Sequence, residues 1–142
     1  MLFRILFFLT ALSCLAESPW TYPIAGVWKL NVNRSTYKVG LSPKRSIQTF
    51  TKAGEWYTAT YEVTSADGRA KKTSYRFKLD GKENKMLNDT ATIAIKLIGD
   101  RTAESISKSN GASTKVKTVI SADGKTRTQF FNYGNILIFE KQ

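Results

Sequence analysis

The stretch GVWKLNVNRSTY, residues 26–37, indicates the fold more clearly than any other part of the sequence. Its apolar side chains, Trp28, Leu30 and Val32, alternate with polar residues, so they lie on one face of an extended chain. A period of two is typical of a strand with one buried face and one solvated face. The same alternation recurs in segments 57–63, 73–79, 92–98 and 115–120. Helical periodicity is nearly absent, so the sequence predicts an all-β protein.

The joints between these segments have turn chemistry. Ser-Ala-Asp-Gly occurs twice, at 65–68 and 121–124, and other glycine-containing pairs stand at 80–81, 99–100 and 110–111. Glycine tolerates positive φ and aspartate bonds its own backbone, which suits tight hairpins. The two Ser-Ala-Asp-Gly segments are otherwise dissimilar, so they predict two similar hairpins rather than a duplicated unit. About nine strands at this spacing predict an antiparallel meander, closed into a barrel of about 8–10 strands.

The first residues have the layout of a secretory signal. Arg4 provides a positive charge, and the run from Ile5 to Leu12 is almost wholly apolar. Cys14 and Ala16 then occupy the −3 and −1 positions of a cleavage site. We therefore expect residues 1–16 to be a signal peptide and residues 17–142 to form one domain. Such a protein acts in the periplasm, in the cell envelope or outside the cell.

Cys14 has a second interpretation. Thr10-Ala11-Leu12-Ser13-Cys14 loosely resembles a bacterial lipobox, which would make residues 1–13 the leader and Cys14 the lipidated first residue. Lipidation anchors a domain without a spanning helix. No other stretch approaches ~20 apolar residues, so we expect no transmembrane segment in the mature chain. Cys14 is also the only cysteine, which excludes an intrachain disulfide.

The chain is strongly basic, with a formal net charge of +11. Basic surfaces favour anionic partners such as lipid headgroups, acidic envelope polymers or nucleic acid. An exported protein meets little nucleic acid, which argues against that partner. The charge therefore points to an anionic surface of the cell envelope.

Several short motifs, taken in order, resemble those of the small exported bacterial lipocalin-like proteins. The matching segments are residues 26–31, 35, 37, 43–44, 66–68, 75–82, 93–96, 100–104, 121–126 and 139–142. They span essentially the whole predicted domain. The resemblance implies a calycin-type antiparallel barrel, and most members of that family have no assigned ligand. The sequence lacks the mid-chain Thr-Asp-Tyr element of the broader lipocalins and the two-helix lid of the fatty-acid-binding proteins.

The resemblance also implies a role for Trp28. In calycins the tryptophan of the first strand packs across the closed end of the barrel, against a cation from a late strand. By position Trp28 is that residue, and Arg127 or Lys141 is its partner. A cation over an indole face contributes ~0.5–2 kcal/mol. We expect this pair to close the barrel structurally, and Trp28 not to contact a ligand.

The sequence offers little catalytic chemistry. It contains no histidine, and its one cysteine lies in the leader. This excludes Ser-His-Asp and Cys-His catalysis and leaves only carboxylates as metal ligands. Among the acids, Glu104 alone lies on a segment whose inward face is ambiguous, and a solvated position is the favoured one. We therefore expect no enzyme, no metal site and no cofactor.

Residues 33–45, NRSTYKVGLSPKR, form one long connection. It contains Gly40 and Pro43, and it predicts a short helical turn at Ser35 to Lys38 followed by a loop. Two interpretations stay open. The connection is either a flap over one mouth of the barrel or a plain crossover between the first two strands.

The first functional hypothesis is that the barrel holds a small apolar ligand. A barrel of eight or more strands can enclose one molecule, and tyrosine hydroxyls would be its polar anchors. The predicted lining residues are Leu30, Tyr57, Tyr61, Tyr75, Phe77, Ile93 and Ile95. In the alternative, these same residues fill the barrel as its core, because two bulky aromatics lie on each of two neighbouring strands.

The second hypothesis is a surface-binding module of the cell envelope, with a filled barrel. Its contact is a basic patch on the outward faces of predicted strands. The patch residues are Arg69, Lys72, Arg76, Lys78, Lys115 and Lys117. Lysines that only keep a β-protein soluble are the simpler explanation. A third hypothesis is a structural or inhibitory envelope protein that meets its partners through loops.

Overall fold

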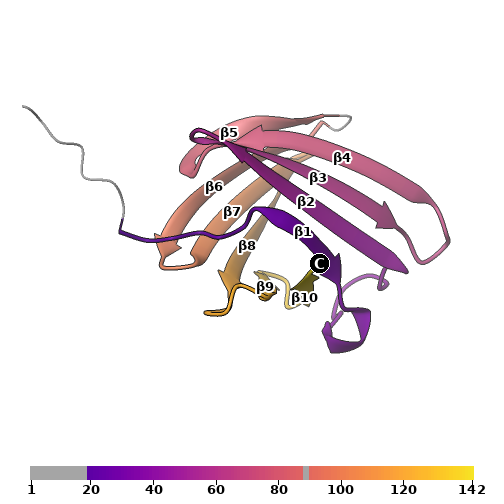
Figure 1. The fold of residues 1–142 in the computed structure, drawn as a ribbon. Coiled ribbons are helices and arrows are strands. Elements are labelled where there is room, and N and C mark those ends of the chain that lie inside the picture. The colour runs from indigo at the N-terminus through magenta and orange to yellow at the C-terminus, as the bar shows by residue number, and fades with distance from the viewer. Residues whose placement is uncertain (1–18, 88–89) are drawn as a thin grey trace, which may run out of the picture.

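The computed structural model describes residues 19–87 and 90–142. The signal peptide predicted for residues 1–16 and the lipidation alternative at Cys14 lie outside the described residues. The described chain forms ten strands in one closed antiparallel barrel (Figure 1). The prediction of an all-β meander closed into a barrel is therefore confirmed.

The strands are β1 (Gly26–Leu30), β2 (Arg45–Ala53), β3 (Trp56–Thr64), β4 (Ala70–Phe77), β5 (Asp80–Leu87), β6 (Thr92–Gly99), β7 (Thr102–Ser109), β8 (Ala112–Ile120), β9 (Thr126–Phe131) and β10 (Ile136–Lys141). A 3-10 turn, η1 (Val32–Arg34), follows β1. Each strand pairs with its neighbours in sequence, and β1 pairs with β10 to close the ring. Among the described residues, no helical segment has the length and apolarity that crossing a bilayer requires.

The barrel has two different ends. At the plug end, residues 19–25 pass across the opening beside the turns at 54–55, 78–79 and 100–101. At the loop end, the β1–β2 connection lies beside the β3–β4 turn, on the right of Figure 1. The backbone N of Lys44 donates to the carbonyl of Thr64 there, at 2.9 Å.

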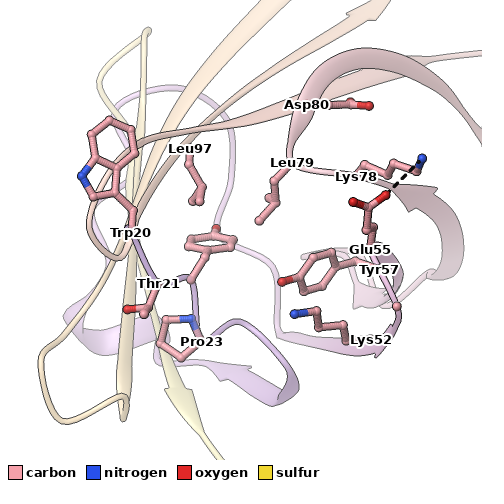
Figure 2. Close-up of a pocket in the computed structure, with 12 residues that line it drawn as sticks. Trp20, Thr21, Pro23, Lys52, Glu55, Tyr57, Lys78, Leu79, Asp80 and Leu97 are labelled. Atoms are coloured by element: carbon pink, nitrogen blue, oxygen red, sulfur yellow. Dashed lines mark ion pairs between the residues drawn. The ribbon is translucent and has the colours of Figure 1, made fainter. Parts of the chain in front are cut away.

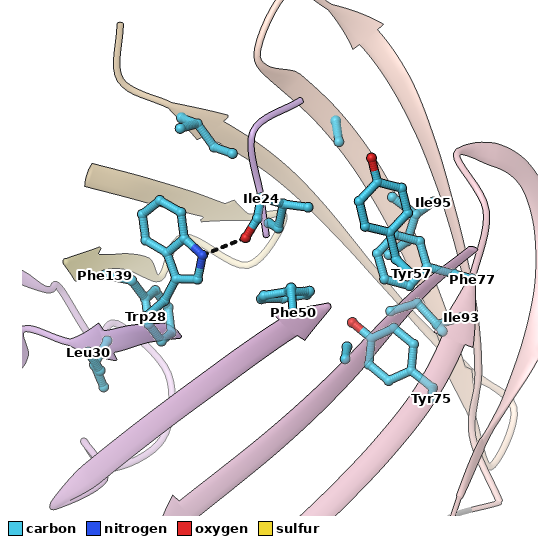
Figure 3. Packing of buried hydrophobic residues seen from close by; sticks show 13 residues of the cluster. Ile24, Trp28, Leu30, Phe50, Tyr57, Tyr75, Phe77, Ile93, Ile95 and Phe139 are labelled. Carbon is cyan, nitrogen blue, oxygen red and sulfur yellow. Dashed lines mark hydrogen bonds between the residues drawn. The ribbon is translucent and has the colours of Figure 1, made fainter. Parts of the chain in front are cut away.

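Residues 19–25, the plug segment, are held to the barrel by hydrogen bonds. Thr21 donates from its backbone N and its Oγ1 to Asp100 Oδ1, at 3.1 and 3.0 Å. The backbone N of Arg101 donates to the Thr21 carbonyl at 2.7 Å. The Trp28 indole donates to the carbonyl of Ile24 at 2.7 Å, as Figure 3 shows. These bonds direct Tyr22 and Ile24 into the barrel, where both pack against the core.

The helical turn predicted at Ser35 to Lys38 is wrong. The structure has η1 at Val32–Arg34 instead, and the backbone at Ser35 is extended. Asn31 explains the difference, because its side chain accepts from the backbone N of Arg34 at 3.1 Å and caps the turn there. The turn therefore begins directly after β1.

The rest of the β1–β2 connection is fastened to the β9–β10 turn. Asn135 Oδ1 accepts from the backbone N atoms of Lys38 and Val39 at 2.8 and 2.9 Å, and its Nδ2 donates to the Val39 carbonyl at 2.9 Å. Thr36 also pairs with Ile136 in an isolated antiparallel bridge. The connection is a crossover tied to its neighbour, not a free flap.

Both Ser-Ala-Asp-Gly segments form hairpin turns, one between β3 and β4 and one between β8 and β9. Gly68 donates its backbone N to the Ser65 carbonyl, and Gly124 donates to the Ser121 carbonyl, each at 2.9 Å. The two glycines have φ of +87° and +72°. Other residues rarely adopt these values, which explains the glycine at each turn.

Candidate functional site

One side of the barrel interior is built of aromatic rings. Strands β2, β3 and β4 contribute Phe50, Tyr57, Tyr61, Tyr75 and Phe77, here called the aromatic wall. The Tyr57 and Phe77 rings stack with centroids 5.2 Å apart, and Tyr61 meets Tyr75 edge-on at 5.4 Å. Alternate residues of a strand point to the same face, so the period of two places these rings inside. Figure 3 shows this for Phe50, Tyr57, Tyr75 and Phe77, and Tyr61 borders the enclosed cavity.

The opposite side of the interior is small and polar. Strands β7, β8 and β9 contribute Ala103, Ser105, Thr118, Arg127 and Gln129, here called the polar wall. The two walls enclose a cavity of about 20 Å³. A cavity of about 10–15 Å³ is needed for one water. The interior therefore has no room for an organic molecule in this conformation. It matches the alternative in which the predicted lining residues fill the barrel as its core.

Arg127 is the buried cation of the polar wall. Only 2% of its surface is exposed. Its Nη1 donates to Gln48 Oε1, and its guanidinium lies over the rings of Phe50 and Phe139, at 4.9 and 5.0 Å from their centroids. Its Nε has no hydrogen-bond partner, and no carboxylate of the described residues pairs with it. The barrel therefore encloses a positive charge that lacks a counter-charge.

Tyr22 of the plug segment reaches this charge from the plug end. Its side chain borders the enclosed cavity together with Thr118 and Arg127. Burial raises the pKa of Tyr22 to about 12, although the positive charge of Arg127 opposes that shift. The phenol is therefore neutral at physiological pH and supplies a dipole, not a counter-ion, to the guanidinium.

Two of the three tyrosines of the aromatic wall share a hydrogen bond. The hydroxyls of Tyr61 and Tyr75 are in direct contact. Burial, the largest cause, raises the pKa of Tyr75 well above its usual value. These hydroxyls give the aromatic wall one polar point that faces the enclosed cavity.

A larger pocket of about 830 Å³ opens at the plug end (Figure 2). Its apolar surface comes from Tyr57, Leu79 and Leu97 on the barrel and from Trp20 and Pro23 on the plug segment. Two cations border it. Lys52 Nζ lies over the Tyr57 ring, 5.5 Å from its centroid. Lys78 Nζ pairs with Glu55 Oε2 at 3.6 Å.

Tyr22 lines both the plug-end pocket and the enclosed cavity. Among the described residues, it is the only one that lines both. The pocket volume lies within the range of about 300–1,000 Å³ that is usual for small-molecule sites.

The seven residues predicted to line a ligand site are all packed within the barrel core. Tyr61, Tyr75, Phe77 and Ile95 border the enclosed cavity, and Tyr57 borders the plug-end pocket. The other two, Leu30 and Ile93, are buried in the core but border neither of these spaces.

Trp28 is fully buried, and a cation lies over its ring. That cation is Lys141, at 5.6 Å from the ring centroid. Arg127, the other partner that the resemblance implied, stacks instead on Phe50 and Phe139 inside the barrel. The β1–β10 register explains this, because Trp28 stands directly opposite Lys141.

Four of the six residues of the predicted basic patch lie on or beside β4. Arg69 pairs with an aspartate at 2.7 Å. Lys72 and Lys78 each pair with a glutamate at 3.6 Å. Arg76 stacks on the ring of Trp56 at 4.7 Å. Each of these charges already has a partner on the same surface.

The other two residues of the predicted patch, Lys115 and Lys117, lie on β8. Strands β5, β6 and β7 separate them from β4. Lys115 pairs with Glu104 at 3.2 Å, and Lys117 lies over the Phe130 ring at 5.6 Å. The six residues therefore do not form one patch, and Glu104 lies on the outer face of β7 as the favoured interpretation expected.

Sequence reasoning missed Tyr22, Gln48, Phe50, Thr118 and Gln129. The last four stand at inward positions of their strands. Thr118 lies in the predicted alternation of residues 115–120, and a signal for the other three exists in the alternation of residues 46–50 and 127–129. The glutamines in these two segments resemble a solvated face, so the segments were not predicted to have a buried face. Among the described residues, no group of three or more potential metal-ligating side chains of His, Cys, Asp or Glu comes together.

No protein-family model matches the chain, and no curated protein matches its sequence. Solved structures do match its fold. The wild-type fluorescent protein UnaG superposes with a TM-score of 0.58 at 16% identity, over 84% of this chain and 98% of UnaG. A single-residue UnaG mutant gives the same score and identity, over 84% and 96%. The chain therefore shares the overall barrel fold of UnaG.

Proposed function

We propose that this chain binds a small, largely apolar anion inside its barrel, with Arg127 as the counter-charge. The buried, unpaired guanidinium carries the proposal. An isolated charge in an apolar interior is strongly unfavourable unless it is paired and hydrogen-bonded. A ligand with a carboxylate or another anionic group would supply the missing partner and satisfy the free Nε.

The two walls of the interior suit the two parts of such a ligand. An apolar body would pack against the rings of the aromatic wall. An anionic group would meet Arg127, with neutral hydrogen-bond donors nearby on Gln129 and Thr118. Because charge-assisted hydrogen bonds are about twice as strong as neutral ones, this contact would dominate the choice of ligand.

The ligand would take the place of Tyr22. The enclosed cavity of about 20 Å³ is too small for it, whereas the plug-end pocket of about 830 Å³ is large enough. Since Tyr22 alone borders both spaces, its withdrawal would join them. Tyr22 belongs to the plug segment and not to a strand, so it can move without breaking the barrel.

We further propose that the chain is an exported, non-enzymatic member of the small bacterial lipocalin-like proteins. The leader-like first residues and the ordered short motifs support export and this relationship. The absence of histidine from the sequence supports a binding role rather than catalysis.

The experiment compares two probes of nearly the same shape. Anilinonaphthalene sulfonate is an apolar aromatic anion, and N-phenyl-1-naphthylamine is its uncharged counterpart. Titrated by fluorescence, the wild-type protein should bind the sulfonate more tightly. Arg127→Met should weaken sulfonate binding about tenfold or more, because a hydrogen bond to a charged group contributes about 1.5–3 kcal/mol. Its affinity for the neutral probe should stay within about twofold of the wild-type value.

Lys141→Met is the matched control, because Lys141 is a cation that stacks on Trp28 and borders neither cavity. It should bind both probes as the wild-type protein does. Cooperative urea unfolding of each variant shows that the barrel is intact. Equal binding of the sulfonate by Arg127→Met and the wild-type protein would contradict the proposal.

A further inference from the structure

We propose that the loop end of the barrel docks onto an anionic lipid bilayer through an apolar tip. The tip consists of Val39, Leu41 and Pro43 from the β1–β2 connection and Val63 and Ala66 from the β3–β4 hairpin. Leu41 is 84% exposed and Val39 is 56% exposed. Leu41 and Val39 stand two residues apart in one short loop, so their exposed apolar surfaces are concentrated in one place.

The tip contains a groove. Leu41 and Pro43 border a space of about 490 Å³ on one side. The β3–β4 hairpin borders it on the other, with the apolar residues Val63 and Ala66 and the polar residues Ser65 and Asp67. The groove lies outside the barrel and shares no lining residue with the plug-end pocket or the enclosed cavity. Contiguous exposed apolar surface of this kind marks a site that leaves water on binding.

The exposure of Leu41 is imposed by the fold. Asn135 makes three hydrogen bonds to the backbone of Lys38 and Val39, and Lys44 is bonded to Thr64. These bonds hold both ends of the segment that carries Leu41. They therefore limit its movement and reduce the conformational entropy that is lost when the tip is buried.

Cations surround the tip. Residues 38–45 and 65–71 carry five basic side chains and one carboxylate, a net charge of +4. The five cations, all exposed, are Lys38, Lys44, Arg45, Arg69 and Lys71. The carboxylate, Asp67, is engaged by Arg69 at 2.7 Å.

An anionic bilayer satisfies both features at once. Its acyl boundary accepts apolar side chains, and its phosphates lie just above, where the cations would stand. A second copy of the chain fits less well, because pairing two tips would bring two surfaces of net charge +4 together. The inference does not depend on a ligand in the barrel, because the tip lies at the end opposite the plug segment.

The test is co-sedimentation of the full-length protein with vesicles of phosphatidylcholine, with or without phosphatidylglycerol. We expect binding only where phosphatidylglycerol is present, and loss of binding as salt is raised. Leu41→Ser should weaken this binding on the order of tenfold, because the variant lacks the apolar leucine surface that the bilayer would remove from water. Ile98→Ser, which changes another exposed apolar residue at the plug end, is the control and should bind like the wild-type protein.

A second pair of variants tests the charge. Lys44→Glu combined with Arg45→Glu should reduce binding by about tenfold or more, whereas Lys125→Glu, in the β8–β9 turn at the plug end, should leave it nearly unchanged. Equal binding to vesicles without phosphatidylglycerol, or equal binding by Leu41→Ser and Ile98→Ser, would overturn the proposal. Light scattering that shows a wild-type dimer and a Leu41→Ser monomer would also overturn it, because the tip would then cover a second copy.

Discussion

The aromatic wall and the polar wall face each other across the same barrel, yet they differ in chemistry. The aromatic wall contributes five rings that pack against one another, and the polar wall contributes small and hydrogen-bonding side chains around one cation. Both arise from the same alternation along strands. Under the function proposed above, the aromatic wall would mainly stabilise the fold, and the polar wall would supply the counter-charge for the ligand.

The largest expected effect breaks the aromatic wall. Phe77 is 1% exposed and contacts the rings of Phe50, Tyr57 and Tyr75. Phe77→Ala should lower the free energy of unfolding by about 3–5 kcal/mol, because it removes buried apolar surface and leaves a cavity. Urea unfolding followed by circular dichroism measures this loss. A change below about 1 kcal/mol would mean that the wall is not the core of the fold.

A double change on the polar side should have the opposite sign. Arg127 and Gln48 are both buried and bonded to each other. Replacing both by apolar residues, as in Arg127→Met with Gln48→Leu, removes a buried charge without leaving an unpaired acceptor. We expect the free energy of unfolding of the ligand-free protein to rise by about 2 kcal/mol.

Arg127→Met alone is the comparison for this double variant. It leaves Gln48 Oε1 without its donor, so it should gain less stability than the double change. Urea unfolding measures the stability of each variant. A double variant that is less stable than the wild-type protein would show that Arg127 contributes to the fold rather than to recognition.

The pH dependence of stability tests the position of Tyr22, which the plug segment places inside the barrel. The pKa of Tyr22 is about 12 in the folded protein and about 10 when it is unfolded. Between these values the folded state holds a proton that the unfolded state has lost, so stability is complete below pH 10 and declines as pH rises towards 12. A variant without the Tyr22 hydroxyl should therefore lose less of its free energy of unfolding as the pH rises. At pH 11 the difference from the wild-type loss should be about 1 kcal/mol.

Tyr22→Phe is the variant to measure, by urea unfolding at a series of pH values. Tyr75, whose pKa is also raised by burial, remains in both proteins and cancels in the comparison. Identical slopes for the wild-type protein and Tyr22→Phe would show that the Tyr22 phenol does not lie in the barrel.

The smallest expected effect concerns Ser105 of the polar wall. It borders the enclosed cavity on β7, and its replacement by alanine removes one polar atom and no packing contact of size. Ser105→Ala should change the free energy of unfolding by less than about 0.5 kcal/mol. A loss as large as that of Phe77→Ala would erase the difference between the walls.

The strands and the aromatic wall were predictable from the sequence for one physical reason. Each strand packs a single face against the core, so the period-two alternation in the sequence directly identifies the inward-facing residues. Tyr61, Tyr75 and Phe77 follow that pattern and lie inside. The hairpins were predictable because Asp-Gly pairs favour positive φ locally, without help from distant residues.

The rest of the site depends on contacts between distant residues. Tyr22 precedes the first strand, and its position is set by bonds from Thr21 to Asp100, 79 residues later. The partner of Trp28 is set by the β1–β10 register, which places Lys141 and not Arg127 opposite it. A charged residue such as Arg127 at an inward position also resembles the wet face of a strand. Only the family resemblance pointed to a closing role for it, and its contacts with Phe50 and Phe139 were not predicted.

The seam between β1 and β10 determines when folding can finish. Its residues come from the two ends of the described chain, and the Asn31 side chain donates across it to Glu140, 109 residues away, at 2.9 Å. On a ribosome, β1 therefore waits for the last strand to emerge. Contacts between such distant segments form slowly, so closure should be the late step of folding. Trp28, which is buried beside this seam, would report that step by its fluorescence.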